Sequence, residues 1–165
     1  MFETGEVVVY EGAGVCVIEE IRIEKFNKES RLYYVLKPVK EKSTTIYFPV
    51  DGDGSKLCNV LSEKEAKALL ASDYTALEWI PDDLARKEYF DEILKGKDRF
   101  RMLSMLYLMQ KVKNEKAQNG KRLRAADEKA FNEVKALVLG EISYVINISE
   151  DELLDNIVRK TEATV

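Results

Sequence analysis

The fold is decided by the stretch 7–23, which reads VVVYEGAGVCVIEEIRI. Its first part, Val7–Tyr10, is β-branched and aromatic, and a turn at 11–14 with two glycines follows. The second run ends at Ile23 in alternating apolar and charged residues. Two such runs around a short glycine-containing turn are typical of a β-hairpin. The stretch therefore predicts the first two strands of an antiparallel sheet.

The same pattern continues as far as residue 61. Further β-branched and aromatic runs are separated by polar turns, and they lie at 32–36, 44–49 and 57–61. Four or five short strands at about ten-residue spacing are typical of a small antiparallel barrel, whose closure removes the exposed strand edges. We expect this β domain to span residues 1–61.

The pattern becomes helical from residue 62 onward. Ser62 and Glu65 form a capping box at the start of the first helix. A second helix is expected to have Pro81 in its first turn and to end at Lys95-Gly96. A third helix is expected to be capped by Asp98 and to end at Asn119-Gly120. Ser149 and Glu152 indicate the start of a last helix. The third helix, with a wide apolar face from Met102 to Val112, is expected to be central. An α-helical domain over 62–165 makes the fold class α+β.

Signals for catalysis, cofactors and metals are lacking in this sequence. The chain has 0 His and 2 Cys, so the commonest general base is missing and no metal-binding cysteine pair is present. Phosphate-binding and nucleophile-elbow glycine motifs are also missing. We expect a non-enzymatic protein without cofactor or metal. Because no apolar run reaches about 18 residues, we also expect a cytoplasmic protein without a membrane contact.

Positive charge is concentrated in the middle of the helical part. Residues 86–129 hold 13 Lys+Arg and 7 Asp+Glu, whereas residues 1–85 and 130–165 carry net charges of −6 and −4. Clustered cations can bind the phosphates of a nucleic acid without reading its sequence. The alternative is a solvated face whose charges serve only solubility.

Trp79 is the single Trp of the chain and lies directly before the helix that follows Pro81. One interpretation is a Trp that packs the β domain against the helices or staples the helix start. The other is an aromatic wedge that inserts at a base step of DNA. The residues alone leave both interpretations open.

Both halves of the chain resemble one known family. Phe2–Tyr10, Gly12–Val15 and Tyr33–Lys37 resemble the opening of the CarD/CdnL family of bacterial transcription regulators. Trp79, Arg86-Lys87, Ile93–Asp98, Asp127–Lys129 and Gly140–Ser143 resemble its second half. The N-terminal part is also similar to the polymerase-interacting domain of the transcription-repair coupling factor.

This resemblance implies a Tudor-like, SH3-like barrel that docks on the β subunit of RNA polymerase. The helical domain would then contact promoter DNA at the upstream edge of the melted region, with Trp79 in the splayed minor groove. The result would be a longer-lived open complex, formed by a protein that is monomeric when free and joins the nucleoid through polymerase. No cofactor is implied.

The resemblance also implies the residues of both interfaces. Relatives often use Arg on two adjacent strands, and the matching positions here are Glu24 and Tyr47. The expected polymerase-binding residues are Glu24, Tyr33, Ile46, Tyr47 and Pro49. The expected DNA-binding residues are Trp79, Arg86, Lys87, Lys95, Lys97, Arg99, Arg124 and Lys129. A protein-interaction adaptor with no direct DNA contact is the alternative function, and an enzyme that uses paired carboxylates is a third class.

Overall fold

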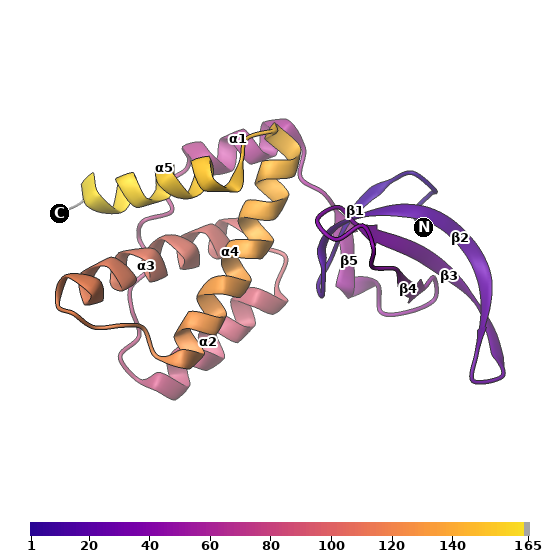
Figure 1. Ribbon diagram of the computed structural model, residues 1–165, viewed down its shortest axis with the longest axis horizontal. Helices are drawn as coiled ribbons and strands as arrows, with labels where there is room; N and C mark the ends of the chain where they lie inside the picture. Colours follow the sequence, from indigo (N-terminus) through magenta and orange to yellow (C-terminus); the bar gives the residue numbers. More distant parts are fainter. Residues whose placement is uncertain (164–165) are drawn as a thin grey trace. The chain divides into compact units, whose positions relative to one another are not determined.

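The computed structural model describes residues 1–163 and shows an α+β protein, as the sequence predicts (Figure 1). The chain divides into two compact units, with the boundary between Val60 and Leu61. The first unit contains the strands and the second contains the five helices of the described residues. Each unit is described by itself below.

The β unit is a five-stranded antiparallel sheet, and the predicted antiparallel pairing is confirmed. Its strands lie in the order β4-β3-β2-β1-β5. Their bounds are β1 Val7–Tyr10, β2 Gly14–Phe26, β3 Glu29–Pro38, β4 Ile46–Pro49 and β5 Leu57–Asn59, with a 3-10 turn at Gly54–Lys56 before β5. The last strand is thus two residues shorter than predicted.

The long hairpin of β2 and β3 has two features that shape the sheet. Asn27 and Lys28 both have positive φ, 51° and 66°, which is the geometry of a two-residue hairpin turn that suits the twist of the strands. The register of β2 on β3 shifts between Ile18 and Glu20. An irregularity of this kind bends the strand and increases its twist.

The predicted closed barrel is not formed. Among the described residues β4 pairs only with β3, and β5 pairs only with β1, so the sheet has two edges. Both edge strands are short, because β4 has four residues and β5 has three. Short edge strands limit edge-to-edge association even in a sheet that does not close into a barrel.

One face of the sheet forms the core of the β unit. Its buried residues alternate along each strand: Val8, Cys16, Ile18, Tyr34, Leu36, Phe48 and Leu57. Tyr33 and Val35 are buried too but belong to the opposite face, because successive side chains of a strand point to opposite sides.

The helical unit contains five helices, and their start signals are mostly those that the sequence predicts. The bounds are α1 Glu63–Ala71, α2 Asp83–Lys95, α3 Arg99–Gln118, α4 Ala125–Ile146 and α5 Glu150–Ala163. The capping box of Ser62 and Glu65 is present, and Asp98 caps α3. Pro81 is not in a first helical turn, however, because Asp82 accepts the capping hydrogen bond from Ala85 and α2 begins at Asp83.

Helix α3 is central, as predicted. Every residue from Met102 to Gln110 is buried, so the helix is surrounded rather than covered on one side. It packs against α2, α4 and α5, and Phe131, Val134 and Ile142 of α4 contribute to the shared core. Trp79, in the segment 72–82 between α1 and α2, packs at the margin of this core.

Candidate functional site

The first candidate interface is the β4 edge of the sheet. Ile46 and Pro49, both predicted to contact polymerase, are half-buried at the two ends of this strand. Since β4 pairs only with β3 in the described structure, its outer side presents backbone N–H and C=O groups to a partner strand. This edge therefore suits recognition by strand addition.

An aromatic cluster lies beside this edge, on the outer face of the sheet. Tyr33 and Tyr47 pack edge to face, with ring centroids 6.3 Å apart. Phe26 contacts both rings, at 5.2 and 5.4 Å. Tyr33 is 7% exposed and forms the buried part of the cluster, whereas Tyr47 and Phe26 are exposed to solvent. A partner would meet Tyr47 and Phe26 first.

Glu24 is not isolated at this face. Its carboxylate accepts a 2.6 Å hydrogen bond from Nε of Arg22, and Glu20 accepts one of 2.8 Å from Nη1 of the same guanidinium. Nη2 of Arg22 also donates to the hydroxyl of Tyr47 at 3.1 Å. The hydrogen bond to Glu24 is the main cause that raises the pKa of Arg22 above its ordinary value.

Arg22 is thus a candidate interface residue that the sequence reasoning missed. The signal was the alternation in Glu20-Ile21-Arg22-Ile23-Glu24, which places three charged residues on one face. The same alternation exposes Ile23 on the other face, where it is 71% exposed opposite Leu32. Exposed apolar side chains of this kind are typical of a docking surface.

The second candidate site surrounds Trp79 in the helical unit. The indole is half-buried and meets Phe90 of α2 edge to face, at 5.9 Å between ring centroids. The guanidinium carbon of Arg86 lies 4.5 Å from the centroid of the indole ring. Trp79 therefore packs on the core of the helical unit while part of its surface stays exposed, and its contact with DNA stays a prediction.

Arg86 does not lie on the surface, contrary to the prediction that it contacts DNA. It is 3% exposed, and its guanidinium forms a bidentate ion pair with Asp127 of α4, at 3.0 and 2.9 Å. It also donates to Asp83 at 2.7 Å, which is the main cause that lowers the pKa of the Asp83 carboxyl below its ordinary value. The expected contact of Arg86 with phosphates is incompatible with this burial.

The side chain of Arg99 is likewise largely buried. Its guanidinium donates to both oxygens of the buried Glu141 carboxylate, at 2.8 and 3.0 Å, and only 14% of its side chain is exposed. Glu141 accepts a further hydrogen bond from the backbone N–H of Leu61 at 2.9 Å. This pair joins α3, α4 and the segment that precedes α1, so its role is structural.

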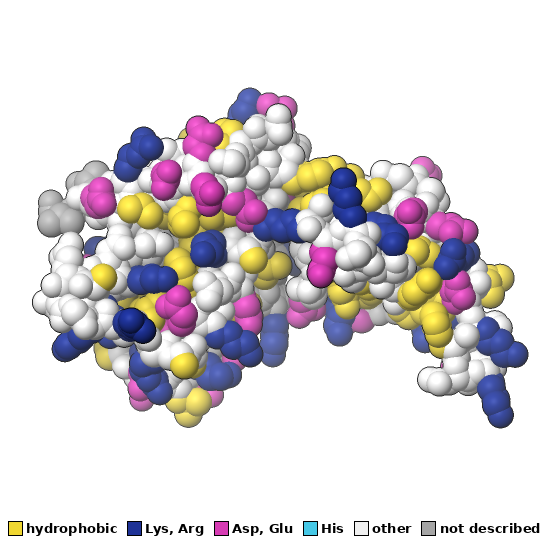
Figure 2. All heavy atoms as spheres, viewed as in Figure 1, with side chains coloured by type: hydrophobic (Ala, Val, Ile, Leu, Met, Phe, Trp, Pro, Cys, Tyr) yellow, Lys and Arg dark blue, Asp and Glu magenta, His cyan; other side chains and the backbone are white. Residues whose placement is uncertain are grey.

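The remaining predicted DNA-binding residues are exposed. Lys87 pairs with Asp91 at 2.9 Å and Arg124 with Asp83 at 2.6 Å, both at the surface. Lys95, Lys97 and Lys129 form no ion pair among the described residues. On the face drawn in Figure 2, Lys and Arg side chains of the helical unit are interspersed with Asp and Glu rather than fused into one patch.

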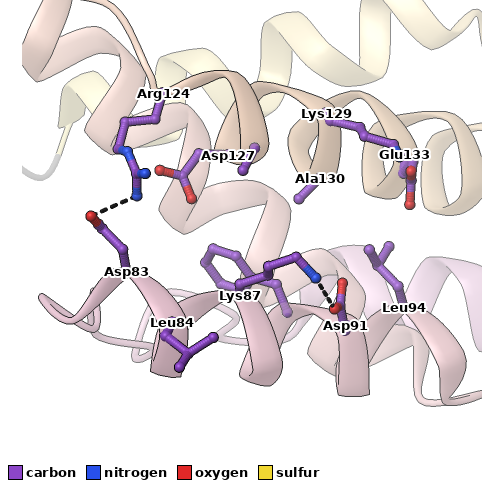
Figure 3. Close-up of a pocket in the computed structure, with 12 residues that line it drawn as sticks. Asp83, Leu84, Lys87, Asp91, Leu94, Arg124, Asp127, Lys129, Ala130 and Glu133 are labelled. Atoms are coloured by element: carbon purple, nitrogen blue, oxygen red, sulfur yellow. Dashed lines mark hydrogen bonds and ion pairs between the residues drawn. The ribbon is translucent and has the colours of Figure 1, made fainter.

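Three of these residues line one groove between α2 and α4, with a volume of about 390 Å³. Its charged walls come from both helices, with Asp83, Lys87 and Asp91 on one side and Arg124, Lys129 and Glu133 on the other (Figure 3). The groove thus brings Lys87, Arg124 and Lys129 together, whereas Lys95 is the last residue of α2 and Lys97 follows that helix, and neither lines the groove.

Metal sites and membrane spans were sought within the same described residues. They contain no group of three or more His, Cys, Asp or Glu side chains placed to hold a metal ion. No helix among them combines the length and the apolar character needed to cross a bilayer.

Comparison with known families identifies the β unit. Residues 2–57 match the CarD-like/TRCF RID domain, and this part of the chain belongs to that family of RNA-polymerase-interacting domains. The protein is therefore an RNA-polymerase-interacting protein. The match ends before the helical unit. No curated protein matches the chain.

Proposed function

We propose that this protein is a transcription regulator that stabilises the promoter open complex. In this proposal the β unit binds the β subunit of RNA polymerase, and the helical unit contacts promoter DNA at the upstream edge of the melted region. The protein would act in the cytoplasm, on the nucleoid, as a monomer that joins polymerase. The observation that carries the proposal is the match of residues 2–57 to a polymerase-interacting domain, in one chain with a helical unit that contains the basic segment 86–129.

The polymerase contact is supported by the β4 edge and the aromatic cluster. Strand addition supplies backbone hydrogen bonds, and neighbouring side chains supply specificity. Tyr47 and Arg22 lie beside that edge and present an aromatic ring and a guanidinium, the two groups most enriched at interface hot spots.

The DNA contact is supported by Trp79 and by exposed cations of the basic segment 86–129. A half-exposed indole can stack on a base at an unstacked step, which contributes about 1–3 kcal/mol by analogy with other single-strand binders. Lys95, Lys97 and Lys129 are exposed and available to phosphates. Such contacts are weak alone, but attachment to polymerase raises the effective concentration of the helical unit at the promoter.

The lifetime of open complexes tests this proposal. Trp79→Ala should shorten the lifetime toward that without the protein, while the affinity for the polymerase β subunit stays unchanged. The matched control is Tyr144→Ala, which truncates an exposed aromatic residue of α4 and should leave the lifetime at the wild-type value. Tyr144 lies 17 residues along α4 from Asp127, a rise of about 25 Å. Equal lifetimes for wild type and Trp79→Ala would contradict the proposal.

A protein-interaction adaptor without DNA contact is the second candidate. It is favoured by one observation, namely that several cations of the basic segment are already paired with carboxylates, among them Arg86, Arg99, Lys113 and Arg124. Charge reversal of Lys95, Lys97 and Lys129 to Glu separates the two functions. An adaptor would keep its effect on transcription in this variant at every salt concentration, whereas a DNA-contacting regulator would lose it.

A further inference from the structure

The Arg86 guanidinium has no hydrogen-bond donor left for a ligand. Arginine has five N–H donors. Two bind the carboxylate of Asp127, one binds Asp83, and two reach the backbone carbonyls of Ile80 and Pro81, at 2.9 and 3.3 Å. Because every donor is used within the protein, the function of this side chain is to hold its neighbours.

The groups that it holds are those around Trp79. The guanidinium plane lies near the indole, with 4.5 Å from its carbon to the ring centroid, and Phe90 meets the same indole edge to face. The two carbonyls that Arg86 binds belong to the residues directly after Trp79. One side chain thus restrains both the ring and the backbone that carries it.

The position of Trp79 in the chain makes this restraint necessary. Residues 73–80 between α1 and α2 contain neither helix nor strand. No ladder of backbone hydrogen bonds therefore sets the direction of the indole, and a free loop would have to be ordered at a cost in binding energy. Arg86 connects this segment to α4 through the bidentate pair with Asp127, which ties it to the packed helices.

We infer that Arg86 is a positioning residue that, through Asp127, fixes the indole of Trp79 in the orientation in which it meets DNA. The inference rests on the proposed function for the DNA contact, but the restraint on the indole is independent of it. Replacement of Arg86 alone would leave the Asp127 carboxylate buried and unpaired, which is strongly destabilising. The informative variant is therefore the double replacement Arg86→Met/Asp127→Leu, which removes both charges and keeps similar volumes.

The first measurement is the fluorescence of Trp79 in the free protein. Since this residue is the only Trp, its emission maximum and its quenching by acrylamide report on the indole alone. Arg86→Met/Asp127→Leu should shift the emission to longer wavelength and increase quenching, while circular dichroism shows an unchanged helix content. A purely structural ion pair would alter thermal stability without changing the emission of the folded protein.

The matched control is Lys113→Met/Glu128→Leu. This second pair also joins a cation to a carboxylate of α4, at 3.0 Å, and its cation also lies over an aromatic ring, Phe131, at 4.7 Å. The replacement likewise leaves the net charge unchanged, and the ion pair and the ring contact of Lys113 and Glu128 do not involve the indole. Emission and quenching should match the wild type.

A conservative variant separates charge from shape. Arg86→Lys keeps the positive charge beside Asp127 but loses the planar group that stacks on the indole and the separate donors to Ile80 and Pro81. Its emission should move in the same direction as that of the double variant, because the restraint depends on the planar guanidinium rather than on charge alone.

The second measurement is the lifetime of the promoter open complex. Arg86→Met/Asp127→Leu should shorten it by about tenfold, which corresponds to ~1.4 kcal/mol, with unchanged affinity for polymerase. Wild-type emission in both Arg86 variants would overturn the inference. If Trp79→Ala shortens the lifetime and the double variant does not, the inference fails and the proposed function stands. If Trp79→Ala has no effect, the proposed function fails, and the emission alone decides whether Arg86 holds the indole.

Discussion

Glu141 of α4 accepts two hydrogen bonds from the Arg99 guanidinium and is 2% exposed. It also accepts the N–H of Leu61, the first residue of the helical unit. A single buried carboxylate thus joins the start of α3, the C-terminal part of α4 and the segment that leads to α1. No buried polar side-chain atom of the described residues lacks a hydrogen-bond partner, so this network is fully satisfied.

Removal of the Glu141 carboxylate should therefore destabilise the helical unit strongly. Glu141→Ala leaves the Arg99 charge and the Leu61 N–H without a partner, and breaking a buried pair in this way costs about 3–5 kcal/mol. The thermal midpoint should fall by about 10–20 °C for a domain of this size. The double variant Arg99→Met/Glu141→Leu should lose less, because it leaves no buried charge, and differential scanning calorimetry compares the two. A single variant as stable as the double one would show that the pair contributes little.

Backbone strain in the hairpin turn gives a second prediction. Lys28 has φ 66°, a conformation that costs a residue with a Cβ atom about 1 kcal/mol relative to glycine. Lys28→Gly should therefore stabilise the β unit by up to about 1 kcal/mol, as measured by urea unfolding. The control is Gly14→Ala at φ 73°, where the opposite change should destabilise the same unit. If Lys28→Gly were neutral while Gly14→Ala destabilised, the turn would carry no strain.

Burial of Cys16 gives a third prediction, on pH dependence. Desolvation raises the pKa of this thiol from 9.0 to about 11, so the neutral form is favoured in the folded protein. At a given pH its thiolate fraction is lower by about a hundredfold, and labelling slows accordingly. In a Cys58→Ser background, Cys16 of the native protein should react with a disulfide reagent at least about a hundredfold more slowly than Cys16 of the protein unfolded in urea. Equal rates in the native and unfolded protein would contradict the burial.

The same pKa shift determines the direction of the stability change with pH. The folded state keeps the Cys16 proton between about pH 9 and 11, whereas the unfolded state loses it, so stability falls as pH rises through this range. Between pH 8.5 and 10.5 the wild type should lose about 1–2 kcal/mol more than Cys16→Ala. The comparison with Cys16→Ala removes the contribution of the tyrosines and lysines that titrate in the same range.

Local patterns in the sequence were sufficient for most of the fold. The runs with period two predicted the antiparallel sheet, and the caps at Ser62 and Asp98 predicted the starts of α1 and α3. These predictions were possible because hairpins and helix caps depend only on residues that are neighbours in the sequence. The prediction that Pro81 lies in the first turn of α2 was wrong, because the next residue, Asp82, is the stronger N-cap and α2 begins after it. The open edges of the sheet could not be foreseen, since closure depends on whether the two edge strands β4 and β5 pair with each other, which local patterns do not determine.

The site was predicted less well than the fold, for a related reason. Sequence counts showed a basic segment but not which cations are buried. Arg86 and Asp127 are 41 positions apart, and Arg99 and Glu141 are 42 apart, so only the folded helices bring these pairs together. Arg22 was overlooked because relatives suggested Glu24 and Tyr47, although the guanidinium of Arg22 lies between them.

The last prediction concerns this group on the β unit. Tyr47→Ala removes the exposed ring from the cluster with Phe26 and Tyr33 and leaves Arg22 without its aromatic contact. Truncation of a central aromatic residue at an interface costs about 2 kcal/mol or more, so the affinity for the polymerase β subunit should fall by at least about tenfold. Binding of labelled protein to the isolated subunit measures this loss.

Two controls make this measurement decisive. Tyr144→Ala truncates an aromatic residue of comparable exposure in the helical unit and should bind the β subunit like the wild type. Arg22→Ala keeps Tyr47 but removes its hydrogen bond and its cation, and it should weaken binding in the same direction as Tyr47→Ala. Wild-type affinity in both Tyr47→Ala and Arg22→Ala would exclude this face of the sheet as the polymerase contact.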